Sequence, residues 1–274
     1  MGRNLNMKDY EKKVMDHYNK VAKDEGDSEL STMKDRYIRH KETGAILSAI
    51  ETFVKETGRE DLSIIDVGCG NGFTLSEIKK RFEKANVEGL EKNDSLRELA
   101  QKREGLGSSI YAGDITNPFV SMVGQKDVVI TQRVVINLLD TEDQKKAIRN
   151  ICDAVKVGGI LIMIECFSGS LQNLNEAREE FGFEPIEPSY HNLYLDEIML
   201  PSESDGFERY RAEGIRPENF LSSHYYVSRV LHDIALNGKP FMRNSHFVDF
   251  MTQSIPEEIG DYSPLKIYVF KKVK

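Results

Sequence analysis

A short glycine-rich segment that contains an acid is the clearest candidate for chemistry in this sequence. Residues 64–72 read IIDVGCGNG, an apolar run followed by glycines at alternate positions. Glycines let the backbone turn tightly and approach a ligand with no side chain in the way. Asp66 stands two residues before the first glycine, where its carboxylate would repel a phosphate but attract an ammonium group. The segment therefore predicts a loop that binds a ligand carrying an amine.

The spacing of the glycines separates this loop from the dinucleotide fingerprint GxGxxG. The third glycine of that fingerprint comes three residues after the second, whereas Gly72 follows Gly70 by only two. This difference counts against a phosphate-bearing dinucleotide as the ligand.

Two further acids follow apolar runs, as ligand-binding acids do in folds that alternate strands and helices. Glu91 ends the run at residues 87–90, where an acid accepts hydrogen bonds from ribose hydroxyls. Asp114 lies in the sequence YAGDI, where a carboxylate is placed to accept from an adenine amine. Because the carboxyl ends of parallel strands form one crevice, we expect Asp66, Glu91 and Asp114 to converge.

In this order, the segments IIDVGCGNG, VEGLEKN, YAGDI, DVVITQRVVINLL and VKVGGILIMIE resemble the class I S-adenosylmethionine-dependent methyltransferases over roughly residues 60–166. The resemblance implies a methyltransferase of the small-molecule type with S-adenosylmethionine as its cofactor. It also implies a role for each matching residue. The cofactor contacts would be Asp66 near the methionine ammonium, Gly68, Gly70 and Gly72 along the loop, Glu91 at the ribose, Asp114 and Ile115 at the adenine, and Gln132 at the reacting methyl.

The sequence departs from the methyltransferases that modify amino groups of nucleic-acid bases. Those proteins carry Asn/Asp-Pro-Pro-Tyr/Phe after the fourth strand, whereas this chain has TQRV at residues 131–134. A net charge of -8 also opposes a polyanionic partner. We therefore expect transfer to an oxygen or nitrogen atom of a small molecule, such as a sugar or a phosphorylated metabolite. The alternatives are a nucleotide-dependent oxidoreductase of similar fold and an inactive cofactor-binding protein.

A histidine within a long, irregular part of the chain is the candidate catalytic residue. A hydroxyl acceptor must lose a proton, and histidine accepts protons near neutral pH. His191 lies in PSYHNLY, among residues that form hydrogen bonds, and is the candidate base. An amine or thiolate acceptor would need no base. By analogy with small-molecule members of the family, His17 and Tyr18, or residues 36–39, would close over the cofactor.

The pattern of apolar residues predicts a Rossmann-like, doubly wound, mostly parallel α/β sheet with an N-terminal helical cap. Helices are expected within residues 8–57, and Asp94 or Ser95 is expected to cap the helix at residues 95–102. The expected strands are 62–67, 87–90, 110–111, 127–131, 159–165, 220–227 and 265–271, and the other expected helices are 75–82, 143–155, 170–181 and 228–236.

The length of the chain fits one domain with additions. We expect a cap over residues 1–60 and a methyltransferase domain over residues 61–274, in which residues 167–263 contain substrate-binding insertions. The chain has three scattered cysteines, which predicts neither a disulfide framework nor a metal site. It has no membrane-length apolar run and no leader-like start, so a cytoplasmic protein is expected. A homo-oligomer is compatible with the sequence, which leaves the acceptor and the need for a base open.

Overall fold

A single mixed sheet organises the protein, for which the computed structural model describes residues 7–274, with side chains from residue 11 onward. Within these residues the strand order is β3-β2-β1-β4-β5-β7-β6. β1 to β5 are parallel, and β7 runs antiparallel between β5 and β6. The strands are β1 (Ser63–Val67), β2 (Asn86–Glu91), β3 (Ile110–Ala112), β4 (Lys126–Gln132), β5 (Val155–Cys166), β6 (Phe207–Arg209) and β7 (Leu265–Lys272). The expected Rossmann-like fold is confirmed.

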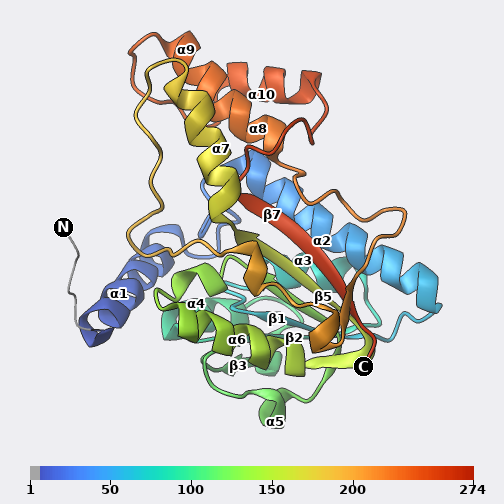
Figure 1. The fold of residues 1–274 in the computed structure, drawn as a ribbon. Helices are drawn as coiled ribbons and strands as arrows, with labels where there is room; N and C mark the ends of the chain where they lie inside the picture. The colour runs from blue at the N-terminus through green and yellow to red at the C-terminus, as the bar shows by residue number, and fades with distance from the viewer. Residues whose placement is uncertain (1–6) are drawn as a thin grey trace.

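The central strands form because their apolar runs are covered on both faces. Ile64 and Ile65 of β1 and residues 160–164 of β5 have no exposed surface. Helices lie on both faces of the sheet (Figure 1). The connecting helices are α3 (Phe73–Arg81), α4 (Asp94–Gln101), α5 (Val120–Val123) and α6 (Thr141–Asp153), with short η1 (Gly107–Ser109) and η2 (Val135–Asn137).

Side-chain caps fix where several helices begin. The prediction that Asp94 or Ser95 caps α4 was wrong, because the Oδ1 atom of Asn93 accepts from the backbone of Leu96 at 2.9 Å. Asp35 caps α2 (Arg36–Thr57), and Gly58, with a φ of 66°, ends it.

The two N-terminal helices differ in how they relate to the sheet. Ile46, Ile50 and Phe53 of α2 belong to the main hydrophobic core, so α2 is an integral layer of the fold. α1 (Met7–Glu25) lies away from this layer (Figure 1) and lines a cavity described below. The expected cap includes residues 1–6, which lie outside the described residues.

The segment between β5 and β7 is a largely helical insertion. Its helices α7 to α10 gather at one end of the sheet (Figure 1). The insertion includes α7 (Ser168–Glu179), η3 (Glu197–Met199), η4 (Glu203–Asp205), β6, α8 (Ser222–Tyr226), the π-helical η5 (Val227–Leu231), α9 (His232–Leu236) and α10 (His246–Ser254). Among residues 7–274, no helix is both long and apolar enough to cross a membrane.

The expected strand at residues 220–227 was wrong, because residues 222–226 form α8. The aromatic residues there suggested a strand, but tertiary hydrogen bonds decide the conformation. Ser222 Oγ donates to the Ile259 carbonyl at 2.7 Å. His224 is buried between Asp35 and Thr252, at 3.1 and 3.2 Å. These contacts attach the insertion to the start of α2 and override local strand propensity.

Candidate functional site

A cavity of about 1130 Å³ lies at the carboxyl ends of β1, β2 and β4. Its walls come from α1, the loop before α2, the glycine loop, the residues after β4 and residues 189–194 of the insertion. Most of the site residues expected from sequence line this one cavity: Asp66, Gly68, Gly70, Glu91, Asp114, Ile115, Gln132 and His191. The cavity is thus the place where parallel α/β sheets bind ligands.

Gly72 does not line the cavity and instead packs the loop against the fold. Its φ of 74° precedes α3, and a Cβ there would lie 3.0 Å from the Cβ of Ala100. Gly68 lines the cavity and also allows the loop its conformation, because it has a φ of 81°. A Cβ on Gly68 would lie 2.3 Å from Cγ2 of Val134, so only glycine fits.

Two buried ionisable groups of the cavity lack complete hydrogen bonding. Oδ1 of Asp66 has no hydrogen-bond partner among the described residues, and Asp66 is only 2% exposed. Burial and the nearby Glu91 carboxylate raise the pKa of Asp66 to about 7. Nε of Arg39 likewise lacks a partner in the described chain. Burial and the nearby Arg133 lower the pKa of Arg39 to about 10. Such orphaned buried groups are costly unless a ligand pairs with them.

The acid at the end of β2 is held by the glycine loop itself. Oε2 of Glu91 accepts from the Gly70 amide at 2.8 Å, and Oε1 accepts from the Asn93 amide at 2.7 Å. Burial raises the pKa of Glu91, although these amides oppose the effect. Each carboxylate oxygen can accept a further hydrogen bond, so Glu91 can serve the loop and a ligand together.

The acid after β3 is already paired in the structure. Burial alone would raise the pKa of Asp114, but Lys92 at 2.8 Å and bonds from Thr116 hold it below its ordinary value. Asp114 therefore stays ionised and keeps acceptor capacity at the cavity wall. Ile115 beside it is 7% exposed and offers an apolar surface.

The residues after β4 form a polar network that sequence reasoning found only in part. Gln132 accepts from Thr74 Oγ1 at 2.8 Å and donates to Glu42 at 3.0 Å. Glu42 also pairs with Arg133, and neither side chain is more than 11% exposed. Arg133 has a φ of 55°, a strained value for a residue with a side chain. The ion pair between Glu42 and Arg133 could not be predicted, because the two residues lie far apart along the chain and neither belongs to a recognisable motif.

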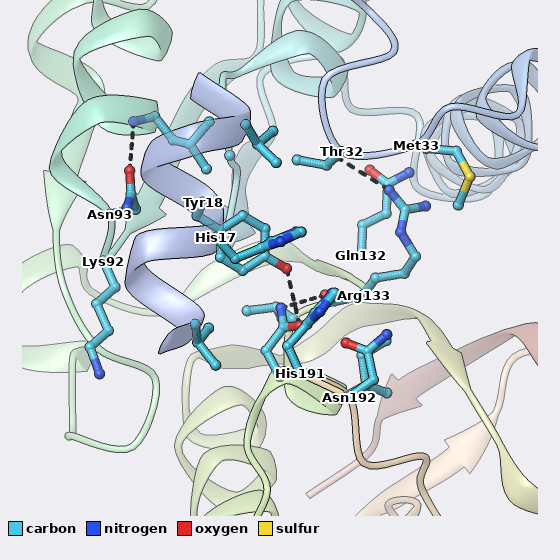
Figure 2. Close-up of a pocket in the computed structure, with 18 of the residues that line it drawn as sticks. His17, Tyr18, Thr32, Met33, Lys92, Asn93, Gln132, Arg133, His191 and Asn192 are labelled. Atoms are coloured by element: carbon cyan, nitrogen blue, oxygen red, sulfur yellow. Dashed lines mark hydrogen bonds between the residues drawn. The ribbon is translucent and has the colours of Figure 1, made fainter. Parts of the chain in front are cut away.

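Another part of the cavity lining consists of hydrogen-bonding rings and an amide. We call His17, Tyr18, Tyr190, His191 and Asn192 the histidine wall. His17 stacks on His191 with ring centroids 4.3 Å apart, and Tyr190 Oη lies 3.3 Å from His17 Nδ1. In Figure 2 His17 and Tyr18 extend from α1 toward His191 and Arg133. Within the described chain, Nδ1 of His191 and Oδ1 of Asn192 have no partner.

The protonation state of this wall follows from its burial. Desolvation and the neighbouring His17 lower the pKa of His191 to about 4. Desolvation, with Lys20 and Lys34, also lowers the pKa of His17. Burial raises the pKa of Tyr18 to about 12. His17, Tyr18 and His191 are therefore uncharged near neutral pH.

The floor of the cavity adds residues that the sequence did not single out. Cys166, Tyr194, Tyr225 and Arg243 line it, and three of them come from the insertion. Tyr225 was missed because its segment was expected to be a strand. Within the described part of the chain, no three His, Cys, Asp or Glu side chains gather as metal ligands would.

Comparisons with known proteins agree with this geometry. The model of a family described as a methyltransferase domain matches residues 64–159. The malonyl-[acyl-carrier protein] O-methyltransferase of Bacillus cereus is 24% identical over 153 residues, which are 53% of this chain and 54% of that protein. The chain thus spans about half the length of curated relatives that it matches.

Solved structures extend the likeness of the fold beyond the matched segment. A SAM-dependent methyltransferase from Anabaena variabilis has a TM-score of 0.54 at 15% identity, covering 98% of this chain and 96% of its own. Magnesium protoporphyrin IX methyltransferase from Synechocystis, solved with bound SAH, also has a TM-score of 0.54, at 16% identity and with 75% and 95% coverage. At these identities the two structures show a shared fold.

The family match covers β1 to the start of β5, which carry the glycine loop, Glu91, Asp114 and Gln132. The chain therefore contains a segment that matches a methyltransferase domain, within a fold that it shares with S-adenosylmethionine-dependent methyltransferases.

Proposed function

We propose that this protein transfers the methyl group of S-adenosylmethionine to an oxygen or nitrogen atom of a small polar acceptor. The observation that carries the proposal is that one cavity holds two chemically different sets of side chains, which we call its charged half and its uncharged half. Asp66 and Arg39 bring opposite charges without complete pairing, while the histidine wall is polar but uncharged. One half suits the zwitterionic amino-acid end of the donor, and the other suits a neutral acceptor.

The charged half fits the amino-acid end of S-adenosylmethionine. The carboxylate of Asp66 would take the α-ammonium group, and the guanidinium of Arg39 would take the α-carboxylate. Both orphaned groups would then be paired, and the total charge of the half would not change. When bound, the cofactor supplies a methyl group already activated on a sulfonium. A phosphate-bearing dinucleotide would instead meet the Asp66 carboxylate.

The remaining cofactor contacts follow the expected sites. Glu91 would accept from the ribose hydroxyls through the lone pairs left free by Gly70 and Asn93. Asp114 would accept from the adenine amine, with Ile115 against the ring. Gln132 would face the methionine part, held in place by Thr74 and Glu42.

The uncharged half fits a hydroxyl- or amine-bearing acceptor such as a sugar. His191 and Asn192 would receive its polar hydrogens at their unpaired atoms, and the tyrosines of the cavity would cover its apolar faces. With a pKa of about 4, neutral His191 holds an extra proton weakly at pH 7. We therefore favour a role in orienting the acceptor, with proton removal assisted only as the bond to the methyl group forms.

We also propose functions for α1, which lies within the expected cap of residues 1–60, and for the insertion of residues 167–263. α1 would close the cofactor side of the cavity, and the insertion would supply the acceptor contacts through residues 189–194 and Tyr225. The B. cereus relative acts on a malonyl group held by a carrier protein, as its name states. An acceptor held by a carrier protein is the alternative for this chain, and the carboxylate of a malonyl group would be charged, unlike the hydroxyl or amine that the uncharged half fits.

A thermal melt and a transfer assay test the proposal together. S-adenosylhomocysteine should raise the melting temperature by mass action, whereas NAD should leave it unchanged. Methyl-labelled S-adenosylmethionine and the small-molecule fraction of a cell extract should then yield a labelled product. A melting temperature that NAD raises and S-adenosylhomocysteine does not would contradict the binding of S-adenosylmethionine. Binding without labelled product in any extract would show an inactive cofactor-binding protein.

A further inference from the structure

A buried acid outside the cavity holds the loop that joins the two halves of the site. Glu165, the residue before the end of β5, has no exposed surface. Its Oε1 accepts from the backbone amides of Val134 at 3.1 Å and Val135 at 3.2 Å. Its Oε2 accepts from the Ile136 amide at 3.4 Å. One carboxylate therefore satisfies three consecutive amides at the start of η2.

The cation opposite Glu165 on β7 and the cation at the start of the anchored loop are bound to other acids. Lys266 is its register partner on β7, but its ammonium binds Glu197 at 2.8 Å and Asp261 at 3.1 Å. Arg133 pairs with Glu42. A buried carboxylate stabilised mainly by backbone amides is costly, which suggests that the loop geometry it enforces is useful.

The anchored loop touches both halves of the cavity. Val134 fills the space beside Gly68, which belongs to the donor side. Asn137 accepts from the Tyr18 hydroxyl at 3.0 Å, which attaches the loop to α1 and the histidine wall. Arg133, at the start of the loop, has the strained φ of 55°. A shift of this loop would therefore change how the acceptor lies relative to the donor.

We propose that Glu165 is a positioning residue, which fixes residues 133–138 through three backbone amides and thereby aligns the methyl acceptor with the donor. This inference rests on the proposed function, but the anchoring itself does not depend on it. The alignment of donor and acceptor strongly affects the rate of methyl transfer, since a displacement of about 1 Å can reduce turnover roughly 100-fold.

The anchor should weaken as pH falls. Burial raises the pKa of Glu165 to about 7, although the amides of the loop oppose the effect. Of the groups around the loop, Asp66 on the donor side of the cavity has a pKa of about 7 and titrates in the same range, whereas the groups that contact the loop or pair with Glu165 in register do not. Burial raises the pKa values of Tyr18 and Cys166 to about 12, and the pKa values of Lys266 and Arg133 are raised, so both stay charged. A protonated Glu165 presents a hydroxyl donor toward amides that also donate, so the loop should loosen below pH 7.

Hydrogen exchange and kinetics on the full chain test the proposal. Glu165→Gln keeps the shape but replaces one acceptor oxygen by an NH₂ donor. Glu208→Gln, at an exposed position of β6 in the same sheet, is the matched control. We expect exchange of residues 134–136 to rise roughly tenfold in Glu165→Gln at pH 8. We expect kcat to fall roughly 10- to 100-fold, while the Kd for S-adenosylhomocysteine changes less than about threefold. Glu208→Gln should match the wild type.

The outcomes separate positioning from a merely structural role. Unchanged loop exchange, or a fall in turnover that only follows the loss of folded protein, would overturn the inference. If Glu165→Gln does not fold, the variant Asp66→Asn decides, because it removes the other acid of the site with a pKa of about 7. Its loop exchange, corrected for intrinsic rates, should rise between pH 8 and pH 6, and a flat profile would overturn the anchor. Absence of methyl transfer by the wild type would overturn the proposed function and the effect on alignment, while the exchange result would still show whether Glu165 anchors the loop.

Discussion

The affinity for S-adenosylmethionine should fall as the pH is lowered from 7, because Asp66 must be ionised to pair with the ligand's ammonium group. In the ligand-free protein the pKa of Asp66 is about 7, so half of the molecules carry the proton at that pH. Binding should lower this pKa to its ordinary range or below, since an opposite charge then neighbours the carboxylate. An acid whose pKa falls on binding gives an affinity that rises with pH.

The size of the effect follows from the two protonation states. Between about pH 7 and about pH 5.5 the ionised fraction of ligand-free Asp66 falls about 16-fold, which corresponds to about 1.6 kcal/mol of binding free energy. The ligand's own α-amino group stays charged in this range, because its pKa lies at about 7.7–8.0. Titration calorimetry at the two pH values measures the ratio of the two affinities for S-adenosylmethionine directly.

A variant isolates the contribution of Asp66. Glu91 also has a raised pKa, so the wild-type slope contains both acids. Asp66→Asn should bind more weakly at pH 7 and lose most of the slope. Asp61→Asn, at an exposed side chain, should behave as the wild type. Equal wild-type affinity at the two pH values, or an undiminished slope in Asp66→Asn, would refute the assignment of Asp66 to the ammonium group.

Three substitutions examine other parts of the site. Glu91→Ala should weaken S-adenosylmethionine binding by about 1.5–3 kcal/mol, as charge-assisted hydrogen bonds are lost, and unchanged calorimetric affinity would count against the ribose site. His191→Ala should reduce kcat more than cofactor affinity, and wild-type turnover would remove His191 from the reaction. Gly68→Ala should lower stability by about 1–3 kcal/mol because of its φ of 81° and the contact with Val134, measured by denaturant unfolding. Gly44→Ala, in a helix with open space around it, should be neutral or stabilising.

The sheet and the donor half of the cavity were largely predictable because their signals are local. A continuous apolar run, glycines that need positive φ and an acid at a strand end each lie within a few residues. The ends of parallel strands then bring Asp66, Glu91 and Asp114 to one cavity by topology alone. The roles assigned to these residues stay predictions.

The insertion and the polar networks were less predictable because they depend on contacts across the chain. Residues 220–227 have strand-like composition, yet Asp35 and Thr252 hold His224 in a helix. Glu42 and Arg133 meet only after α2 folds against the sheet. Asn93 was missed as a cap because Asp94 and Ser95 are good caps by residue type and stand beside it. The expected cap at residues 1–60 also joined α1 with α2, although α2 belongs to the core.

The insertion leaves and re-enters the sheet at one place. Cys166 and Leu265 are paired in register on β5 and β7, and the Phe167 amide donates to the Pro264 carbonyl at 2.7 Å. The two ends of this long segment are therefore held together by the sheet, whatever lies between them. A chain built in this way can exchange, lengthen or shorten the segment in evolution with little entropic cost to folding. For engineering, exchanging residues 167–264 between relatives, together with Asp35 that pairs with His224, would test whether the insertion selects the acceptor.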